Sequence, residues 1–267
     1  MRSVRFFTVL VLALQLGAVA PSFADDVEHY APRKRAPAKV VDLLAYMKSH
    51  VITEPMDEVE KRIPKYNRLQ HFGRWVDVDS DCQTTMTEVL IRDSDPSEPL
   101  EFRDAQQCAL VKGLWNDPYT GTAFRVKTAL QIDHVVALKH AYVSGAHAWD
   151  QPRRCTYSNY MGNDFHLLAV SGHENMSKGA QGPDTYLPPN EAFHCEYVGI
   201  WMRIKAIWKL DTTPDEVAML ESVLKTKRCS KETYTMKEAA LENERKATNN
   251  VPSVCARAAE ATPSDTL

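Results

Sequence analysis

The sequence predicts an α+β fold that disulfide bonds stabilise, and three features predict it. Two short apolar runs, at 132–138 and 165–170, have the length and composition of β-strands, and a short polar helix follows the second. Two later segments, at 191–210 and 213–224, carry apolar residues at helical spacing. The chain also holds six cysteines, an even number, which in an exported protein indicates disulfides.

The first residues have the composition of a secretory signal peptide, which we expect to end at Ala24. Arg2 and Arg5 precede an apolar run from Phe6 to about Val19, and small residues follow that run. A transmembrane helix needs roughly 20 apolar residues, so this run is too short to span a bilayer. We therefore expect an exported protein, periplasmic or extracellular, without stable membrane insertion.

The mature chain is mildly acidic. Cleavage at Ala24 removes two of the 32 basic residues and none of the 35 acidic ones, which leaves a net charge of −5. This charge excludes a generally basic nucleic-acid coat, so binding to a polyanion must come from a local patch.

Composition divides the rest of the chain into four segments. Residues 25–37 are charged and lack periodicity, so we expect a flexible leader. Residues 38–125 should form the N-terminal α+β part of a single domain, and 126–230 its core and packing helices. Residues 231–267 are highly charged, and we expect a disordered tail with at most a short helix.

Turn and capping residues predict several elements of these segments. A helix is expected from Lys39 to Val51, a hairpin around 116–121, and either a helix or a strand at 87–92. Asn190 can cap a helix from about Glu191 to Leu210. The sequence from Thr213 to Glu216 has the pattern of a capping box for a further helix.

The cysteine pairing is not fixed by the sequence, because six cysteines allow fifteen pairings. A zinc site is the alternative, but no CxxC motif occurs. From the order of the elements we expect the pairs Cys82–Cys108, Cys155–Cys195 and Cys229–Cys255.

The stretch from Gln131 to Gly179 carries the candidate chemistry. Asp133 and His134 are neighbours on the first strand, and neighbours on an ideal strand point to opposite faces. Both can serve one pocket only at a strand end, where the backbone turns. With Asn175 on the following helix, they would place one hard cation beside one general base.

Longer motifs surround these residues. The chain reads DHVVALKHAYVSGAHAW, LLAVSGHENMSKG and YLPP, preceded by FGRW, DCQTTMTEVLIRD and WNDPYTG. From about Tyr66 to Leu210 this pattern resembles the HNH (His-Me finger, ββα-metal) endonucleases, and in particular the secreted nucleases of the DUF1524 type. The resemblance implies a ββα-metal core within 126–230, with surrounding helices, and a hydrolase that cleaves DNA and/or RNA.

The resemblance also implies a role for individual residues. His134 matches the general base that deprotonates the attacking water. Asp133 and Asn175 match the two protein ligands of one divalent cation, usually Mg²⁺, with Mn²⁺ as an alternative. His166 stands where the pattern usually has an Asn that holds the base's imidazole, and Lys178 matches a residue that contacts phosphate.

Two residues depart from the family pattern. His166 replaces the usual Asn, as a tolerated substitute or as a sign of altered chemistry. Met86 replaces a frequent Arg, so one phosphate contact is missing if that Arg binds phosphate. These departures favour a second hypothesis, a non-catalytic nucleic-acid-binding or envelope protein that keeps the fold. A third alternative is a zinc hydrolase that uses His173 or His194.

Substrate binding is expected to be weak, salt-dependent and largely non-specific, because the surface is acidic. Arg153 and Arg154 lie between the two strands and are candidates for contact with nucleic acid, with a simple surface pair as the alternative. The form of the nucleic acid and the oligomeric state are left open.

Overall fold

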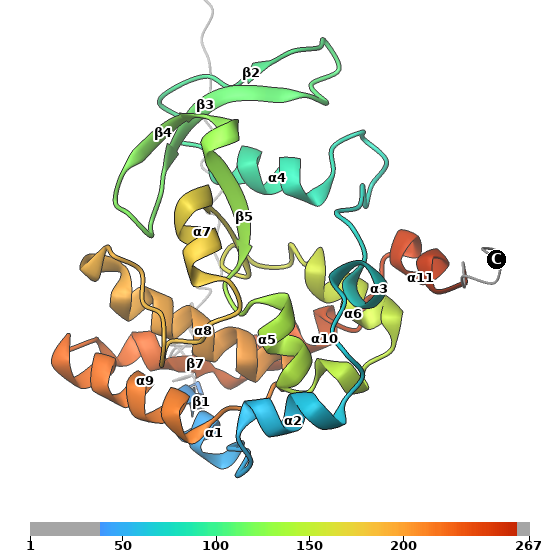
Figure 1. Ribbon diagram of the computed structural model, residues 1–267. Helices are drawn as coiled ribbons and strands as arrows, with labels where there is room; N and C mark the ends of the chain where they lie inside the picture. The colour runs from blue at the N-terminus through green and yellow to red at the C-terminus, as the bar shows by residue number, and fades with distance from the viewer. Residues whose placement is uncertain (1–37, 261–267) are drawn as a thin grey trace, which may run out of the picture. The chain divides into compact units, whose positions relative to one another are not determined.

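The computed structural model of the chain describes residues 38–260 (Figure 1). The expected signal peptide and leader, and the last residues of the expected tail, lie outside the described residues. The described part is a mixed α/β structure with three disulfide bonds. In Figure 1 a three-stranded sheet lies at one end and helices α1, α8, α9 and α10 at the other, with β5 and α7 between them.

The elements follow one another along the chain without internal repetition. The strands are β1 (Val40–Asp42), β2 (Glu101–Phe102), β3 (Leu110–Asn116), β4 (Ala123–Val126), β5 (Leu130–His134), β6 (Leu167–Ser171) and β7 (Thr235–Lys237). The α-helices are α1 (Leu43–Ser49), α2 (Met56–Arg62), α3 (Arg68–Phe72), α4 (Thr85–Arg92), α5 (Leu138–Val143), α6 (Gln151–Ser158), α7 (Gly172–Lys178), α8 (His194–Trp208), α9 (Pro214–Thr226), α10 (Glu238–Ala247) and α11 (Ser253–Glu260).

The strands form small antiparallel sheets. β3 is the middle strand between β2 and β4, which confirms the expected hairpin, and β1 pairs with β7. β5 pairs with β6 over its whole length, from Leu130 opposite Ser171 to His134 opposite Leu167. Ser171 then caps α7 by accepting a hydrogen bond from the Glu174 N–H. The helix therefore begins where the strand ends, and it runs beside β5.

Helix α8 is the centre of the larger apolar core. Its apolar residues at helical spacing, Tyr197, Trp201, Ile204 and Trp208, are fully buried. The predicted capping box of α9 is confirmed, because Thr213 and Glu216 exchange both hydrogen bonds. These packed helices provide a rigid base below β5 and α7.

Three predicted elements differ from the structure. The strand expected at 132–138 is β5, which runs from Leu130 to His134 and ends before Val135. The helix expected from Lys39 begins only at Leu43, because Val40–Asp42 pair with β7 and the Asp42 side chain caps the helix. The expected disordered tail is ordered through residue 260, as β7, α10 and α11. Its charge lies mostly on exposed faces, while Leu241 and Cys255 are buried. The high charge of this segment therefore indicates solvent-exposed helix faces and not disorder.

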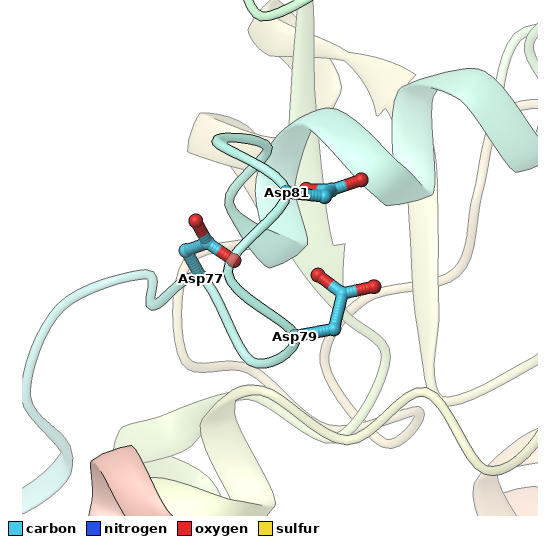
Figure 2. A group of neighbouring side chains, drawn as sticks. All are labelled: Asp77, Asp79 and Asp81. Carbon is cyan, nitrogen blue, oxygen red and sulfur yellow. The ribbon is translucent and has the colours of Figure 1, made fainter.

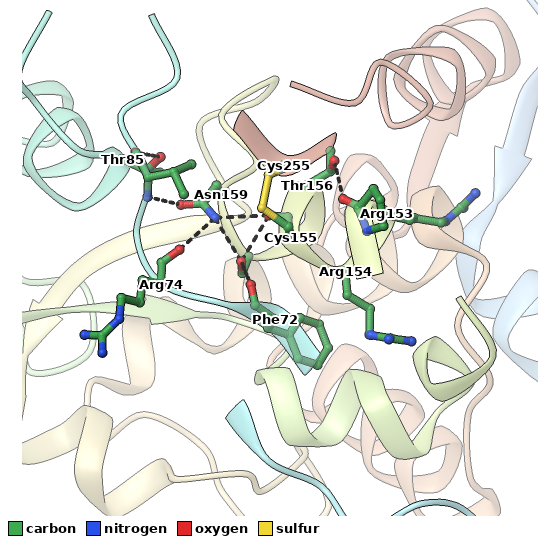
Figure 3. The surroundings of a disulfide bond; sticks show 12 residues. Phe72, Arg74, Thr85, Arg153, Arg154, Cys155, Thr156, Asn159 and Cys255 are labelled. Atoms are coloured by element: carbon green, nitrogen blue, oxygen red, sulfur yellow. Dashed lines mark hydrogen bonds between the residues drawn. A yellow bond between two sulfur atoms is a disulfide. The ribbon is translucent and has the colours of Figure 1, made fainter. Parts of the chain in front are cut away.

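The disulfide prediction was right for one pair and wrong for the other two. Cys82 bonds to Cys108 as expected. Cys155 on α6 bonds to Cys255 on α11, and Cys195 on α8 bonds to Cys229 just after α9 (Figure 3 shows the first of these). The error arose because the tail was expected to be disordered, whereas α11 packs on α6 and brings Cys255 to Cys155.

We expect loss of the Cys155–Cys255 bond to be the most destabilising of the disulfide losses. It spans 100 residues, against 26 for Cys82–Cys108, and a longer loop restricts the unfolded chain more. Replacing both cysteines by alanine should lower the free energy of unfolding by about 2–4 kcal/mol. Urea unfolding measures the free energy of unfolding of the Cys155/Cys255 and Cys82/Cys108 double variants. A larger loss of stability in the Cys82/Cys108 variant would contradict the prediction.

The described residues contain no helix that is both long enough and apolar enough to cross a membrane.

Candidate active site

The three residues expected to form a site lie around one cleft. Asp133, His134 and Asn175 all line a cavity of about 200 Å³, together with Tyr66 and Arg68. His134 is the last residue of β5, so the backbone leaves the strand at this point as the sequence argument required. Asn175 reaches the same cleft from α7.

His134 is held in one orientation. Its Nε2 lies 2.9 Å from the carbonyl oxygen of Ser158, and the ring stacks on Trp75 with centroids 5.1 Å apart and planes 7° apart. A carbonyl oxygen only accepts hydrogen bonds, so we assign the ring proton to Nε2, which leaves Nδ1 unprotonated. Burial lowers the pKa of His134 well below its usual range, and the nearby His166 adds to this effect. The imidazole is therefore neutral at neutral pH.

Asn159 is a positioning residue that sequence reasoning missed. Its side-chain oxygen accepts a hydrogen bond from the Val76 N–H, and its amide group donates to the Arg74 carbonyl oxygen (Figure 3). These bonds fix the turn after Ser158, whose carbonyl holds His134, and they fix the segment that carries Trp75. The partners lie more than 80 residues away in the sequence, so no local spacing pointed to Asn159.

Asp133 is buried with both carboxylate oxygens bonded. Oδ1 accepts a 2.9 Å hydrogen bond from the Lys178 ammonium, and Oδ2 accepts a 2.6 Å bond from the Tyr119 hydroxyl. Lys178 is fully buried and also donates to the His134 carbonyl oxygen. Burial raises the pKa of Asp133, and the Lys178 ammonium opposes that rise. Lys178 therefore holds the acid in place and does not face the solvent, where a phosphate contact would lie.

The residues around the cleft fit a hard cation. The Asn175 amide nitrogen donates to the Gln131 side chain at 2.9 Å, which leaves the Asn175 amide oxygen free. Each Asp133 oxygen keeps a lone pair beyond its hydrogen bond. Carboxylate and amide oxygens suit Mg²⁺ or Mn²⁺ better than zinc, which prefers nitrogen and sulfur.

A separate acidic cluster lies outside the cleft. Carboxylate oxygens of Asp77, Asp79 and Asp81, in the loop before α4, come within 4.8 Å of one another (Figure 2). With Glu88 they occupy positions 1, 3, 5 and 12 of a twelve-residue stretch, which is the carboxylate spacing of EF-hand loops. This is the only place among residues 38–260 where three or more His, Cys, Asp or Glu side chains come that close. A measurement of divalent ions on the whole chain must therefore be controlled for this loop.

Besides the buried Lys178, three other expected site residues lie outside the cleft. His166 is buried behind His134, with ring centroids 6.3 Å apart, and its Nε2 donates to the Tyr157 carbonyl oxygen. Arg153 stacks on Trp149, and Arg154 donates to backbone carbonyls around it. The His134 ring is thus held by the Ser158 carbonyl and not by His166. Neither arginine reaches the cleft.

His166 gives the fold an acid-sensitive group. Burial lowers the pKa of His166 to about 4, so the fold accepts the neutral ring, and the stability it contributes is lost as the pH falls from 6.5 toward 4. We expect His166→Asn to reduce this loss by up to about 1.4 kcal/mol per pH unit. Urea unfolding between pH 6.5 and 4.5 measures it, with the exposed His173→Asn as the control. Equal pH dependence in the two variants would contradict the prediction.

Comparison with known proteins places the cleft within a family domain. Residues 97–221 match the model of the C-terminal domain of GmrSD restriction endonucleases, and this range holds Asp133, His134 and Asn175. An uncharacterised secreted protein of Arthroderma benhamiae is 34% identical over 155 residues, which cover 58% of this chain and 72% of that protein. No solved structure shows a significant match. The chain therefore belongs to the family of the C-terminal domain of GmrSD restriction endonucleases, a nuclease family.

Proposed function

We propose that the chain is a secreted, divalent-metal-dependent endonuclease of the HNH (ββα-metal) type that hydrolyses DNA and/or RNA. The observation that carries the proposal is the shared cleft of Asp133, His134 and Asn175 at the junction of β5 and α7. The strand–strand–helix order of β5, β6 and α7 agrees with a ββα core. The secreted relative and the three disulfides support export.

In this proposal His134 is the general base. Its Nδ1 accepts a proton from the attacking water, while the bond from Nε2–H to the Ser158 carbonyl keeps the ring in position and supports the imidazolium that forms. Trp75 covers one face of the ring and restricts its rotation. The base is ready without prior deprotonation, because burial keeps it neutral.

Asp133 and Asn175 would hold the cation. A bound Mg²⁺ would neutralise charge that develops on the phosphoryl and leaving oxygens. Lys178 and Tyr119 hold the Asp133 carboxyl group in place in the absence of any ion, and the Lys178 ammonium balances part of its charge. We therefore expect a cation site of modest affinity, because part of the acid's charge is already balanced.

The test is cleavage by the purified mature chain of single- and double-stranded DNA and RNA, with Mg²⁺ and with EDTA. Asn175→Ala should remove one of two protein ligands and raise the Mg²⁺ concentration needed for half-maximal rate, by about 10-fold or more. Asp79→Asn in the acidic loop is the control and should leave that concentration unchanged. Binding of nucleic acid without cleavage in any of the four forms would favour the non-catalytic hypothesis instead.

The departure at position 166 gives little support to that second hypothesis. His166 does not hydrogen-bond His134 and does not line the cleft, so its identity leaves the orientation of the base to Ser158. The departure at Met86 concerns substrate contacts and not the reacting groups.

A further inference from the structure

A second cleft adjoins the candidate active site. It has a volume of about 450 Å³, and it is lined by residues of α3, the loop after it and the start of α4: Arg68, Leu69, Gly73, Arg74, Trp75, Thr84 and Met86. Arg68 lines both this cleft and the one that holds His134. The two clefts therefore meet at Arg68, and Trp75 of the second cleft stacks on His134 of the first.

The second cleft offers two cations to a ligand. Arg68 and Arg74 are both exposed. Within residues 38–260 neither guanidinium forms an ion pair of the kind that joins Arg62 to Glu54 or Arg125 to Glu98. Unpaired arginines beside a cleft are suited to phosphate, because the planar guanidinium can donate two parallel hydrogen bonds to its oxygens.

The wall that carries these arginines is fixed in place. Asn159 binds the backbone on both sides of Trp75, and the Thr85 N–H donates to the Val76 carbonyl oxygen. The Trp75 ring stacks on His134, and the Arg68 guanidinium lies over the same ring, 5.8 Å from its centroid. Such a wall loses little conformational freedom when a ligand binds, which favours binding.

Met86 also lines this cleft. Met86 on α4 is apolar, so the cations that line this cleft are Arg68 on α3 and Arg74 in the following loop.

We propose that Arg68 and Arg74 bind the backbone phosphates of the substrate strand on one side of the scissile phosphate, so that the strand reaches His134 across Trp75. This inference rests on the proposed nuclease function, since it gives that site its substrate path. It makes Arg68 and Arg74 substrate-binding residues, in place of Arg153 and Arg154, the candidates that the sequence offered.

The experiment measures binding apart from cleavage. A fluorescently labelled single-stranded oligonucleotide is titrated with the full mature chain carrying His134→Ala, and its dissociation constant is followed as the salt concentration rises. Each lost phosphate contact should reduce the slope of log affinity against log salt by about 0.7 for a single strand. Arg68→Ala and Arg74→Ala together should therefore reduce the slope by about 1.4 and weaken binding at low salt.

Arg103→Ala is the matched control, because Arg103 is exposed, lines neither cleft and carries the same charge. If the double variant keeps the slope of the Arg103→Ala chain, the proposed path is wrong, whatever the cleavage assay shows. If the double variant shows the reduced salt slope while the unmutated chain cleaves no nucleic acid, the proposed phosphate contacts are right and the nuclease proposal is wrong. Thermal unfolding of each variant verifies that all of them are folded.

Discussion

His134→Ala should reduce the rate of Mg²⁺-dependent cleavage by about 10²–10⁴, the usual contribution of a general base. The rate should fall because His134 lines the cleft with an unprotonated Nδ1. No other histidine of the described residues lines this cleft, so none can replace it as the base. Initial rates of plasmid nicking at fixed Mg²⁺ measure the effect. The Michaelis constant should change little, since the ring acts on the water and not on the bound strand.

The matched control for this variant is His173→Ala. His173 lies on α7, two residues before Asn175, but its side chain is 84% exposed, and among residues 38–260 it hydrogen-bonds only Glu174. It should retain nearly full activity. A His134→Ala chain that cleaves within a few-fold of the unmutated rate would remove the general-base assignment and, with it, the proposed mechanism.

The sequence predicted the part of this site that is built from neighbours in the chain. Asp133 and His134 at a strand end, and Asn175 on the helix that follows the next strand, are close in space because β5, β6 and α7 are local and strongly patterned. Lys178 was placed on the correct helix. Its orientation was not predictable, because helical spacing alone does not say that a lysine near the end of a helix turns inward to a buried carboxylate.

The remaining parts of the site depend on contacts between distant segments. Ser158 and Asn159 reach the site only because α6 packs against the segment around Arg74. Tyr119 reaches it only because the turn between β3 and β4 brings its hydroxyl to Asp133 on β5. The disulfides show the same limit, since Cys255 lies in a segment whose composition suggested disorder. The residue pattern of a segment predicts its local structure, whereas contacts between distant segments depend on how the whole core packs.

Lys178→Met should lower the free energy of unfolding by about 3–5 kcal/mol, because it leaves the buried Asp133 carboxylate without its counter-charge. Methionine keeps the length and most of the volume of the side chain, so the loss reports the ion pair and not a cavity. Asp133 keeps only the Tyr119 hydroxyl as a partner. The carboxyl should then take up a proton more easily, because burial raises its pKa and no ammonium opposes the rise. Urea unfolding at pH 7 measures the loss.

Lys225→Met is the control, because Lys225 also lies in the last turn of a helix but is exposed. The free energy of unfolding of Lys225→Met should fall by no more than about 0.5 kcal/mol. The double variant Lys178→Met with Asp133→Asn should recover part of the lost stability, since it removes both buried charges together. If Lys178 were instead a phosphate contact at a solvated helix end, Lys178→Met would be as stable as Lys225→Met and would change only substrate binding. That result would contradict the buried pair and the preorganised carboxylate on which the proposed cation site depends.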